Sequence, residues 1–258
     1  MTNYRLAASA EMLFTELDFE ERVKAISARG FEVEIWNWTT KNLPALAKTN
    51  AVFSSMTGYI EGDLLESDGI SRLLETGAQS LEASKIIDCP RLNLHGTGLD
   101  ENGQAIRKRK VVTGAEWLKA RDTLARMADL AAKHNKVFTL ENLNLLVDHP
   151  DTPFALAEDT IALVESVNNP HLRLNLDLYH AQIGEGNLIS LVERALPLIG
   201  EIQVADVPGR KEPGTGEINY ANIAAALKRL GYSGVIGLEG WASGDSNVAL
   251  DAFAEAFA

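Results

Sequence analysis

Short apolar segments recur along the whole chain, and polar or turn-forming residues border each of them. Runs of this length and composition are typical of buried β-strands. We predict a strand in each of eight segments, which lie at residues 5–10, 31–37, 51–58, 90–96, 136–142, 172–180, 199–206 and 234–240.

Helical patterns fill the intervals between these strands. Their apolar residues are spaced three and four apart, which places them on one face of a helix. The longest pattern, at residues 114–135, predicts about six turns at 3.6 residues per turn. We predict helices at residues 19–30, 43–49, 70–87, 114–135, 159–167, 188–196, 220–231 and 247–258.

The alternation of strands and helices predicts parallel βαβ units. Eight units in 258 residues favour a (β/α)8 TIM barrel. A doubly wound open sheet is the rival, but it usually carries a phosphate-binding glycine fingerprint after a strand, and HGTG at residues 95–98 is too short to be one. Because no linker-like stretch divides the chain, we expect a single domain over residues 1–258.

Charge and composition narrow the range of partners. Lysine and arginine number 24 against 36 aspartate and glutamate residues, so the net charge is −12, and we expect no nucleic-acid partner. The chain contains no run of 18 apolar residues, so we expect no membrane-spanning helix. Its first residues do not resemble a signal peptide. With Cys89 as the single cysteine, these features favour a protein of a reducing, bacterial-type cytoplasm.

Oxygen-bearing side chains stand at the carboxyl ends of four consecutive predicted strands. In TIM barrels this edge carries the functional groups. Several carboxylates buried together need a counter-charge, and a divalent cation is the simplest one. Three carboxylates and one amide oxygen favour Mg²⁺ or Mn²⁺ over a metal that prefers sulfur ligands. We therefore predict a metal site formed by Glu141, Asp177, Gln203 and Glu239.

Three further residues are candidates for binding a substrate. His95 ends the fourth strand, and His180 follows Asp177 by three residues. Arg210 lies after the seventh strand, where it could anchor a substrate carboxylate in an acidic barrel mouth. The alternatives are a structural hydrogen bond for either histidine and a surface position for the arginine.

Large aromatic residues also lie at or near strand ends. We expect them to pack within loops, although they could instead form an apolar wall that excludes water from a reaction. They are Phe14, Trp36, Trp38 and Trp241.

The loop after the seventh predicted strand, VADVPGRKEPGTGEINY at residues 204–220, resembles the corresponding loop of the hydroxypyruvate isomerase family, within the xylose-isomerase-like barrels. DLYHAQ at 177–182 and GEINY at 216–220 are its more specific parts. The resemblance runs nearly end to end and also includes LENLN at 140–144 and IGLEGW at 236–241, with a looser match near the N-terminus.

Transferred position by position, the resemblance implies a role for each candidate. Glu141, Asp177, Gln203 and Glu239 match the family's metal ligands, and Glu141 and Glu239 match its proton donor and acceptor pair. His180 and Arg210 match positions that contact substrate oxygens in related epimerases. The resemblance also implies a homo-oligomer, either a dimer or a tetramer.

The function expected from this resemblance is interconversion of hydroxypyruvate and tartronate semialdehyde, or of a close 2-keto acid or keto-sugar analogue. The loops at residues 95–103 and 142–150 depart from the family pattern, so an epimerase, dehydratase or lyase that uses the same metal site stays an alternative. A non-catalytic barrel that binds a sugar acid or scaffolds a partner is a third possibility, against which the acidic pair argues.

Overall fold

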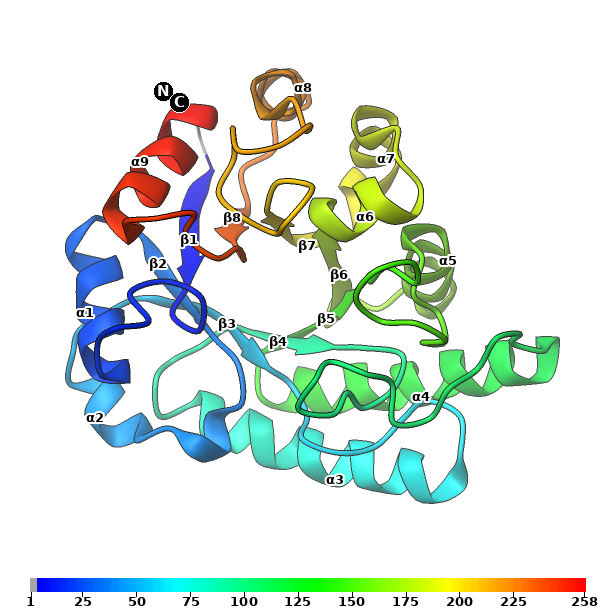
Figure 1. The fold of residues 1–258 in the computed structure, drawn as a ribbon. Helices are drawn as coiled ribbons and strands as arrows, with labels where there is room; N and C mark the ends of the chain where they lie inside the picture. The colour runs from blue at the N-terminus through cyan, green and yellow to red at the C-terminus, as the bar shows by residue number, and fades with distance from the viewer. Residues whose placement is uncertain (1–3) are drawn as a thin grey trace.

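Eight parallel strands close into a barrel in chain order over residues 4–258, the part of the chain that the computed structural model describes (Figure 1). The predicted (β/α)8 barrel is confirmed. The strands are β1 (Arg5–Ser9), β2 (Glu32–Ile35), β3 (Phe53–Thr57), β4 (Arg91–Leu94), β5 (Val137–Glu141), β6 (Leu172–Asp177), β7 (Ile199–Val204) and β8 (Val235–Leu238).

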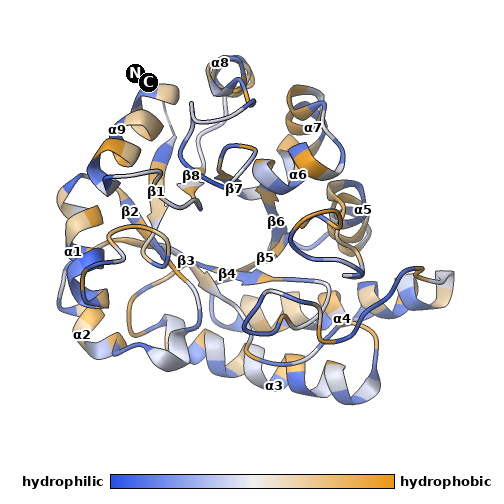
Figure 2. Cartoon of the chain, in the orientation of Figure 1, coloured by the Kyte–Doolittle hydropathy of each residue, from blue (hydrophilic) through white to orange (hydrophobic). Residues whose placement is uncertain are grey.

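Helices surround the barrel, and each carries both hydrophobic and hydrophilic residues (Figures 1 and 2). Every predicted helix is present, with ends shifted by up to three residues. Within residues 4–258, none is long and apolar enough to cross a membrane. The helices are α1 (Phe19–Ala28), α2 (Leu43–Ala47), α3 (Ser67–Ser84), α4 (Gly114–Lys133), α5 (Ala157–Val167), α6 (Leu178–Gly184), α7 (Leu188–Ala195), α8 (Tyr220–Arg229) and α9 (Ser246–Ala256).

The sixth strand is shorter than predicted. It ends at Asp177, and the short helix α6 begins at the next residue, so the predicted strand at residues 172–180 is wrong in its last three positions. The cause is local, because the Asp177 carboxylate accepts a hydrogen bond from the backbone N–H of His180 at 2.9 Å and caps the helix. His180 therefore lies in the first turn of α6 and not on β6.

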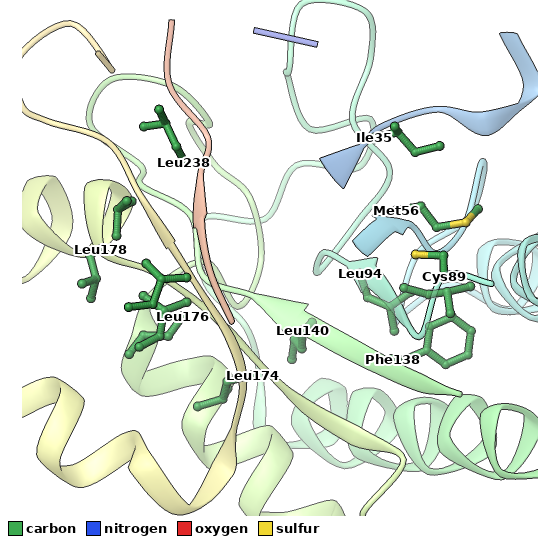
Figure 3. Close-up of a cluster of buried hydrophobic side chains, with 14 of the residues drawn as sticks. Ile35, Met56, Cys89, Leu94, Phe138, Leu140, Leu174, Leu176, Leu178 and Leu238 are labelled. Atoms are coloured by element: carbon green, nitrogen blue, oxygen red, sulfur yellow. The ribbon is translucent and has the colours of Figure 1, made fainter. Parts of the chain in front are cut away.

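Alternate residues of the strands have opposite environments, as the two-residue period of a strand requires. Leu92, Leu94, Phe138 and Leu140 are completely buried in the hydrophobic core. Figure 3 shows Leu94 and Phe138 gathered with other apolar side chains, including Cys89. Burial of one such side chain stabilises the fold by roughly 1.5–3 kcal/mol. The apolar core thus holds the strands against the surrounding layer.

Many of the intervening residues face the barrel axis and are polar. Arg91 on β4 pairs with Glu201 on β7 at 3.1 Å, and Thr139 on β5 donates to Glu201 at 3.2 Å. These strands are not neighbours, so the contacts cross the barrel interior. Polar side chains continue along the barrel interior from this cluster to the carboxyl ends of the strands, where the candidate residues lie.

Candidate active site

Glu141 is the last residue of β5 and points into the barrel mouth. Its Oε2 accepts a hydrogen bond from Asn93 Nδ2, and His95 Nε2 lies 3.0 Å from the same oxygen. Burial opposes ionisation of this carboxyl, but the charge of His95 and the bonds from His95 and Asn93 outweigh it, so the pKa of Glu141 is lowered. Tyr59 holds the other nitrogen of His95 at 2.9 Å.

Glu239 directly follows β8 and has different neighbours. Trp36 Nε1 donates to its Oε1 at 2.7 Å, and Arg210 Nη2 lies 2.5 Å from its Oε2. Burial raises the pKa of Glu239 to about 6, although Arg210 opposes the shift. Glu141 adds to the shift because two nearby carboxylates disfavour double ionisation.

The loop after β7 fixes Arg210. The Asp206 carboxylate accepts backbone N–H bonds from Gly214, Gly216 and Ile218 at 2.9–3.0 Å, which fold the loop back on itself. The backbone N–H of Trp241 donates to the Arg210 carbonyl at 2.8 Å and ties the loop to the end of β8. Arg210 is therefore held over the mouth, as a substrate anchor requires.

Asp177 lies between these two glutamates. Its Oδ2 is buried and has no hydrogen-bond partner within residues 4–258. The nearest cation is Arg210, at 3.9 Å. Burial raises the pKa of Asp177 well above its usual value, and the charges of Glu141 and Glu239 act in the same direction against that of Arg210.

Gln203 belongs to a chain of amides across the barrel. Its Nε2 donates to Glu34 at 3.0 Å, and its Oε1 accepts from Asn175 Nδ2 at 2.6 Å. Asn175 also donates to Asn93 at 3.2 Å, and Asn93 donates to Glu141. The predicted ligand Gln203 is thus engaged at both ends of its amide and is linked to Glu141.

Sequence reasoning did not single out Asn93 or Asn175 of this amide chain. The two-residue alternation could have found them, because RLNL at residues 91–94 and LRLNLD at 172–177 place a polar residue at every inward position. Gly237, which is paired with Gln203 on the neighbouring strand, leaves room for Glu34. A Cβ atom at Gly237 would lie 1.9 Å from the Glu34 carboxyl oxygen.

His180 lies in the first turn of α6 and is completely buried. Its Nε2 is 3.8 Å from Glu141 Oε1 and 3.9 Å from Asp177 Oδ2. On the opposite edge of the ring, Asn144 Nδ2 contacts Nδ1 at 2.7 Å. Burial lowers the pKa of His180 well below its usual value, and the charge of Arg210 adds to the shift. Both effects favour the neutral imidazole.

The aromatic residues near the strand ends differ in their surroundings. Trp38 packs against the hydrophobic core, and its Nε1 donates to Ser80 of α3 at 2.9 Å. Trp36 does more than pack, because its indole binds a candidate catalytic carboxylate. Trp241 is 44% exposed, so it does not form a closed apolar wall.

This arrangement can hold a divalent metal ion. Three buried carboxyl groups, those of Glu141, Asp177 and Glu239, lie near one guanidinium, and ionisation of all three would give more negative charge than Arg210 alone balances. The unpartnered Asp177 Oδ2 is a free oxygen ligand. Carboxylate oxygens of Glu141 and Asp177 also lie within 4.8 Å of one another, beside His180. The donor set therefore fits a cation that prefers oxygen.

Comparison with known proteins identifies the family. The model of the xylose isomerase-like TIM barrel family matches residues 11–256, so the chain belongs to this family. It is 29% identical to the Homo sapiens protein named "Putative hydroxypyruvate isomerase", over 95% of this chain and 92% of the relative. It is 30% identical to the 2-oxo-tetronate isomerase of Pectobacterium atrosepticum, over 91% of each chain.

A solved structure agrees with this assignment. The Brucella melitensis protein named AP endonuclease, family 2, superposes with a TM-score of 0.85 and is 26% identical over 98% of both chains. Together these likenesses confirm the predicted family and the expected class of enzyme, an isomerase.

Proposed function

We propose that the protein isomerises a small 2-keto acid by moving a proton between adjacent carbon atoms. The observation that carries this proposal is the pair of buried glutamates, Glu141 and Glu239, on either side of Asp177. Such a reaction needs one group that removes a proton next to a carbonyl and another that returns a proton to the neighbouring carbon. The two carboxyl groups supply this pair.

In hydroxypyruvate the reaction begins at the hydroxymethyl carbon. One glutamate takes a proton from this carbon, and the bonding electrons pass to the adjacent carbonyl, which gives an enediolate. The other glutamate delivers a proton to the former carbonyl carbon, while a hydroxyl proton moves between the two oxygens. The product is tartronate semialdehyde, and proton exchange with solvent returns both glutamates to their starting states.

The metal-binding residues in this proposal are Glu141, Asp177, Gln203 and Glu239. A bound Mg²⁺ or Mn²⁺ would supply Lewis acidity for the negative charge that develops on oxygen. The fit rests on the uncompensated carboxylates and on the unpartnered oxygen of Asp177.

Arg210 is the proposed anchor for the substrate carboxylate. Its guanidinium can form two parallel hydrogen bonds with a carboxylate, which a lysine cannot do. It now pairs with Glu239, so substrate binding would redistribute its hydrogen bonds. His95 and His180 would contact the substrate oxygens nearer to Glu141. The names of the relatives, hydroxypyruvate isomerase and 2-oxo-tetronate isomerase, support a small keto acid as the substrate class.

Nucleic acid is not a proposed substrate, although one structural neighbour is named an endonuclease. Binding of DNA phosphates depends on clustered positive charge, and this chain has a net charge of −12.

Solvent exchange tests the proposal directly. The protein is incubated with Mn²⁺ or Mg²⁺ and with hydroxypyruvate or 2-oxo-tetronate in D2O, and proton NMR follows both deuterium incorporation and product formation. We expect deuterium next to the carbonyl together with the isomerised product, which is an aldehyde from hydroxypyruvate and a 3-oxo acid from 2-oxo-tetronate. Exchange without isomerisation would point to an epimerase, dehydratase or lyase with the same site. The absence of exchange from both acids, and from a neutral keto-sugar, would leave a non-catalytic binder.

A further inference from the structure

The side chain of Asn144 has a fixed orientation in the loop after β5. Its Oδ1 accepts backbone N–H bonds from Val147 at 2.9 Å and from Asp148 at 3.0 Å. Only an oxygen can accept these bonds, so the other atom must be the NH2 group. The backbone of this loop therefore determines which way the amide faces.

The NH2 group of Asn144 has two acceptors. One N–H points to Asp148 Oδ2 at 2.6 Å, and the other points to His180 Nδ1 at 2.7 Å. Tyr179 also donates to Asp148 Oδ2, at 3.0 Å, which holds that carboxylate in place. Because an NH2 group only donates, His180 Nδ1 must carry a lone pair and no proton.

It follows that the single proton of the neutral imidazole is on Nε2. This atom is buried, has no partner within residues 4–258, and faces the space beside Glu141 and Asp177. A metal ligand needs a lone pair at that atom, and metal-bound histidines usually donate their other N–H to an acceptor. Asn144 offers a donor instead of an acceptor. The proximity of His180 to the two carboxylates is thus not sufficient to make it a ligand.

We propose that Asn144 is a positioning residue that keeps His180 in the Nε2–H tautomer, so that His180 donates a hydrogen bond to a substrate oxygen and does not bind the metal. The part of this inference that concerns the substrate rests on the proposed function. The tautomer and the absence of metal ligation do not rest on the proposed function, and both can be measured without an activity assay.

Exchange of the two loop residues provides the test variant. Asn144→Asp with Asp148→Asn keeps the composition and net charge of the chain. The carboxylate introduced at position 144 can still accept the two backbone bonds, and the amide introduced at position 148 can donate to it, but an oxygen now faces His180 Nδ1. We expect that oxygen to bring a proton to Nδ1. The single variant Asp148→Asn, which keeps Asn144, is the matched control.

Nitrogen NMR of histidine-labelled protein reads the tautomer, with His180→Gln used to assign the signals. We expect Nδ1 of His180 to be unprotonated in the wild type and in Asp148→Asn, and protonated in the exchanged variant. Titration of the wild type with Mg²⁺, and with Zn²⁺ as a strong probe of histidine ligation, should leave the tautomer unchanged. A protonated Nδ1 in the wild type, or direct metal binding at Nε2, would overturn the proposal even if the exchanged variant failed to fold.

Kinetics give the second measurement. Loss of one donor to a charged oxygen corresponds to roughly 10–150-fold. We expect kcat/KM of the exchanged variant to fall within this range, and that of Asp148→Asn to fall much less. If the tautomer switches but kcat/KM does not change, His180 has no role in substrate binding. If the wild type converts no keto acid, the proposed function fails, while the tautomer measurement still decides the role of Asn144.

Discussion

The two glutamates of the barrel mouth stand in walls of opposite character. The Glu141 wall, which we define as Asn93, His95, Glu141, Asn144 and His180, surrounds its carboxylate with amide and imidazole groups. The Glu239 wall, which we define as Trp36, Arg210 and Glu239, pairs its carboxylate with a guanidinium and an indole N–H. Burial acts on both glutamates, yet the pKa of Glu141 is lowered and that of Glu239 is raised to about 6.

The difference shows that one wall mainly orients its carboxylate and the other mainly balances the charge of its carboxylate. In the Glu141 wall, a chain of amides holds the carboxylate through directed hydrogen bonds, which strengthen in a low-dielectric interior. In the Glu239 wall, Arg210 compensates charge and can exchange one carboxylate for another. Variants in the first wall should therefore disturb proton transfer, and variants in the second should disturb the response to substrate charge.

The largest expected effect comes from removal of either carboxylate. Glu141→Gln and Glu239→Gln keep the size of the side chain and an oxygen that can bind metal, but neither amide can exchange a proton at neutral pH. We expect kcat to fall roughly 10²–10⁴-fold in each, the usual range for the loss of one general acid or base. The variant that lacks the proton-abstracting group should also lose deuterium exchange, and the other should keep it.

Asp177→Asn is the control for this pair. It weakens metal binding without removal of a proposed proton carrier, so excess Mn²⁺ should partly restore its activity. If excess Mn²⁺ fully restored the activity of either glutamine variant, that glutamate would act only as a metal ligand, and His95 would be the next candidate for the base.

The next largest effect is expected from Arg210, and it should depend on the charge of the substrate. Arg210→Met removes the proposed anchor but keeps an unbranched side chain of similar length. We expect KM to rise roughly 10–150-fold for a keto acid, since a hydrogen bond to a charged group contributes about 1.5–3 kcal/mol, and far less for a neutral keto-sugar. Steady-state kinetics with both substrates measure the difference. Equal increases would remove Arg210 from the role of carboxylate anchor.

The sequence contained most of the fold and part of the site. Every strand and predicted helix is present, because the apolar spacing that defines them is also what the core buries. Most of the residues expected at the strand ends do lie together, since Arg210 contacts Glu239 and lies near Asp177, and both histidines lie near Glu141. The Asn144–His180 contact and the Trp36–Glu239 bond could not be predicted, since each joins side chains that tertiary structure alone brings together. The helix cap at Asp177 is a local feature, but the apolar residues on both sides of Asp177 favoured a continuous strand.

A smaller effect is expected within the Glu141 wall. Asn93→Ala removes one donor from the carboxylate and leaves His95 in place. We expect kcat to fall about tenfold with little change in KM, because the carboxylate loses orientation while the anchor for the substrate remains. Asn175→Ala breaks the next link of the amide chain without touching Glu141, so its effect should be smaller. If Asn175→Ala were as slow as Asn93→Ala, the whole chain would be needed to hold the carboxylate.

The smallest effect is expected from Trp36→Phe in the Glu239 wall. The indole N–H stabilises the ionised form of Glu239, and a phenyl ring cannot donate. The pKa of Glu239 in the metal-free protein should therefore rise further above 6, so that the carboxyl stays protonated to a higher pH. Because water reaches the indole, which is 38% exposed, we expect kcat/KM to fall only roughly 2–10-fold, as for an ordinary hydrogen bond.

Carbon NMR of glutamate-labelled, metal-free protein measures this titration, with Glu239→Gln used to assign the signal. Trp38→Phe is the matched control, because Trp38 donates to Ser80 and not to the site. The control should leave the pKa of Glu239 unchanged. An unchanged pKa in Trp36→Phe would mean that nearby positive charge, chiefly that of Arg210, opposes the effect of burial without the indole, and the Glu239 wall would then consist of a single ion pair.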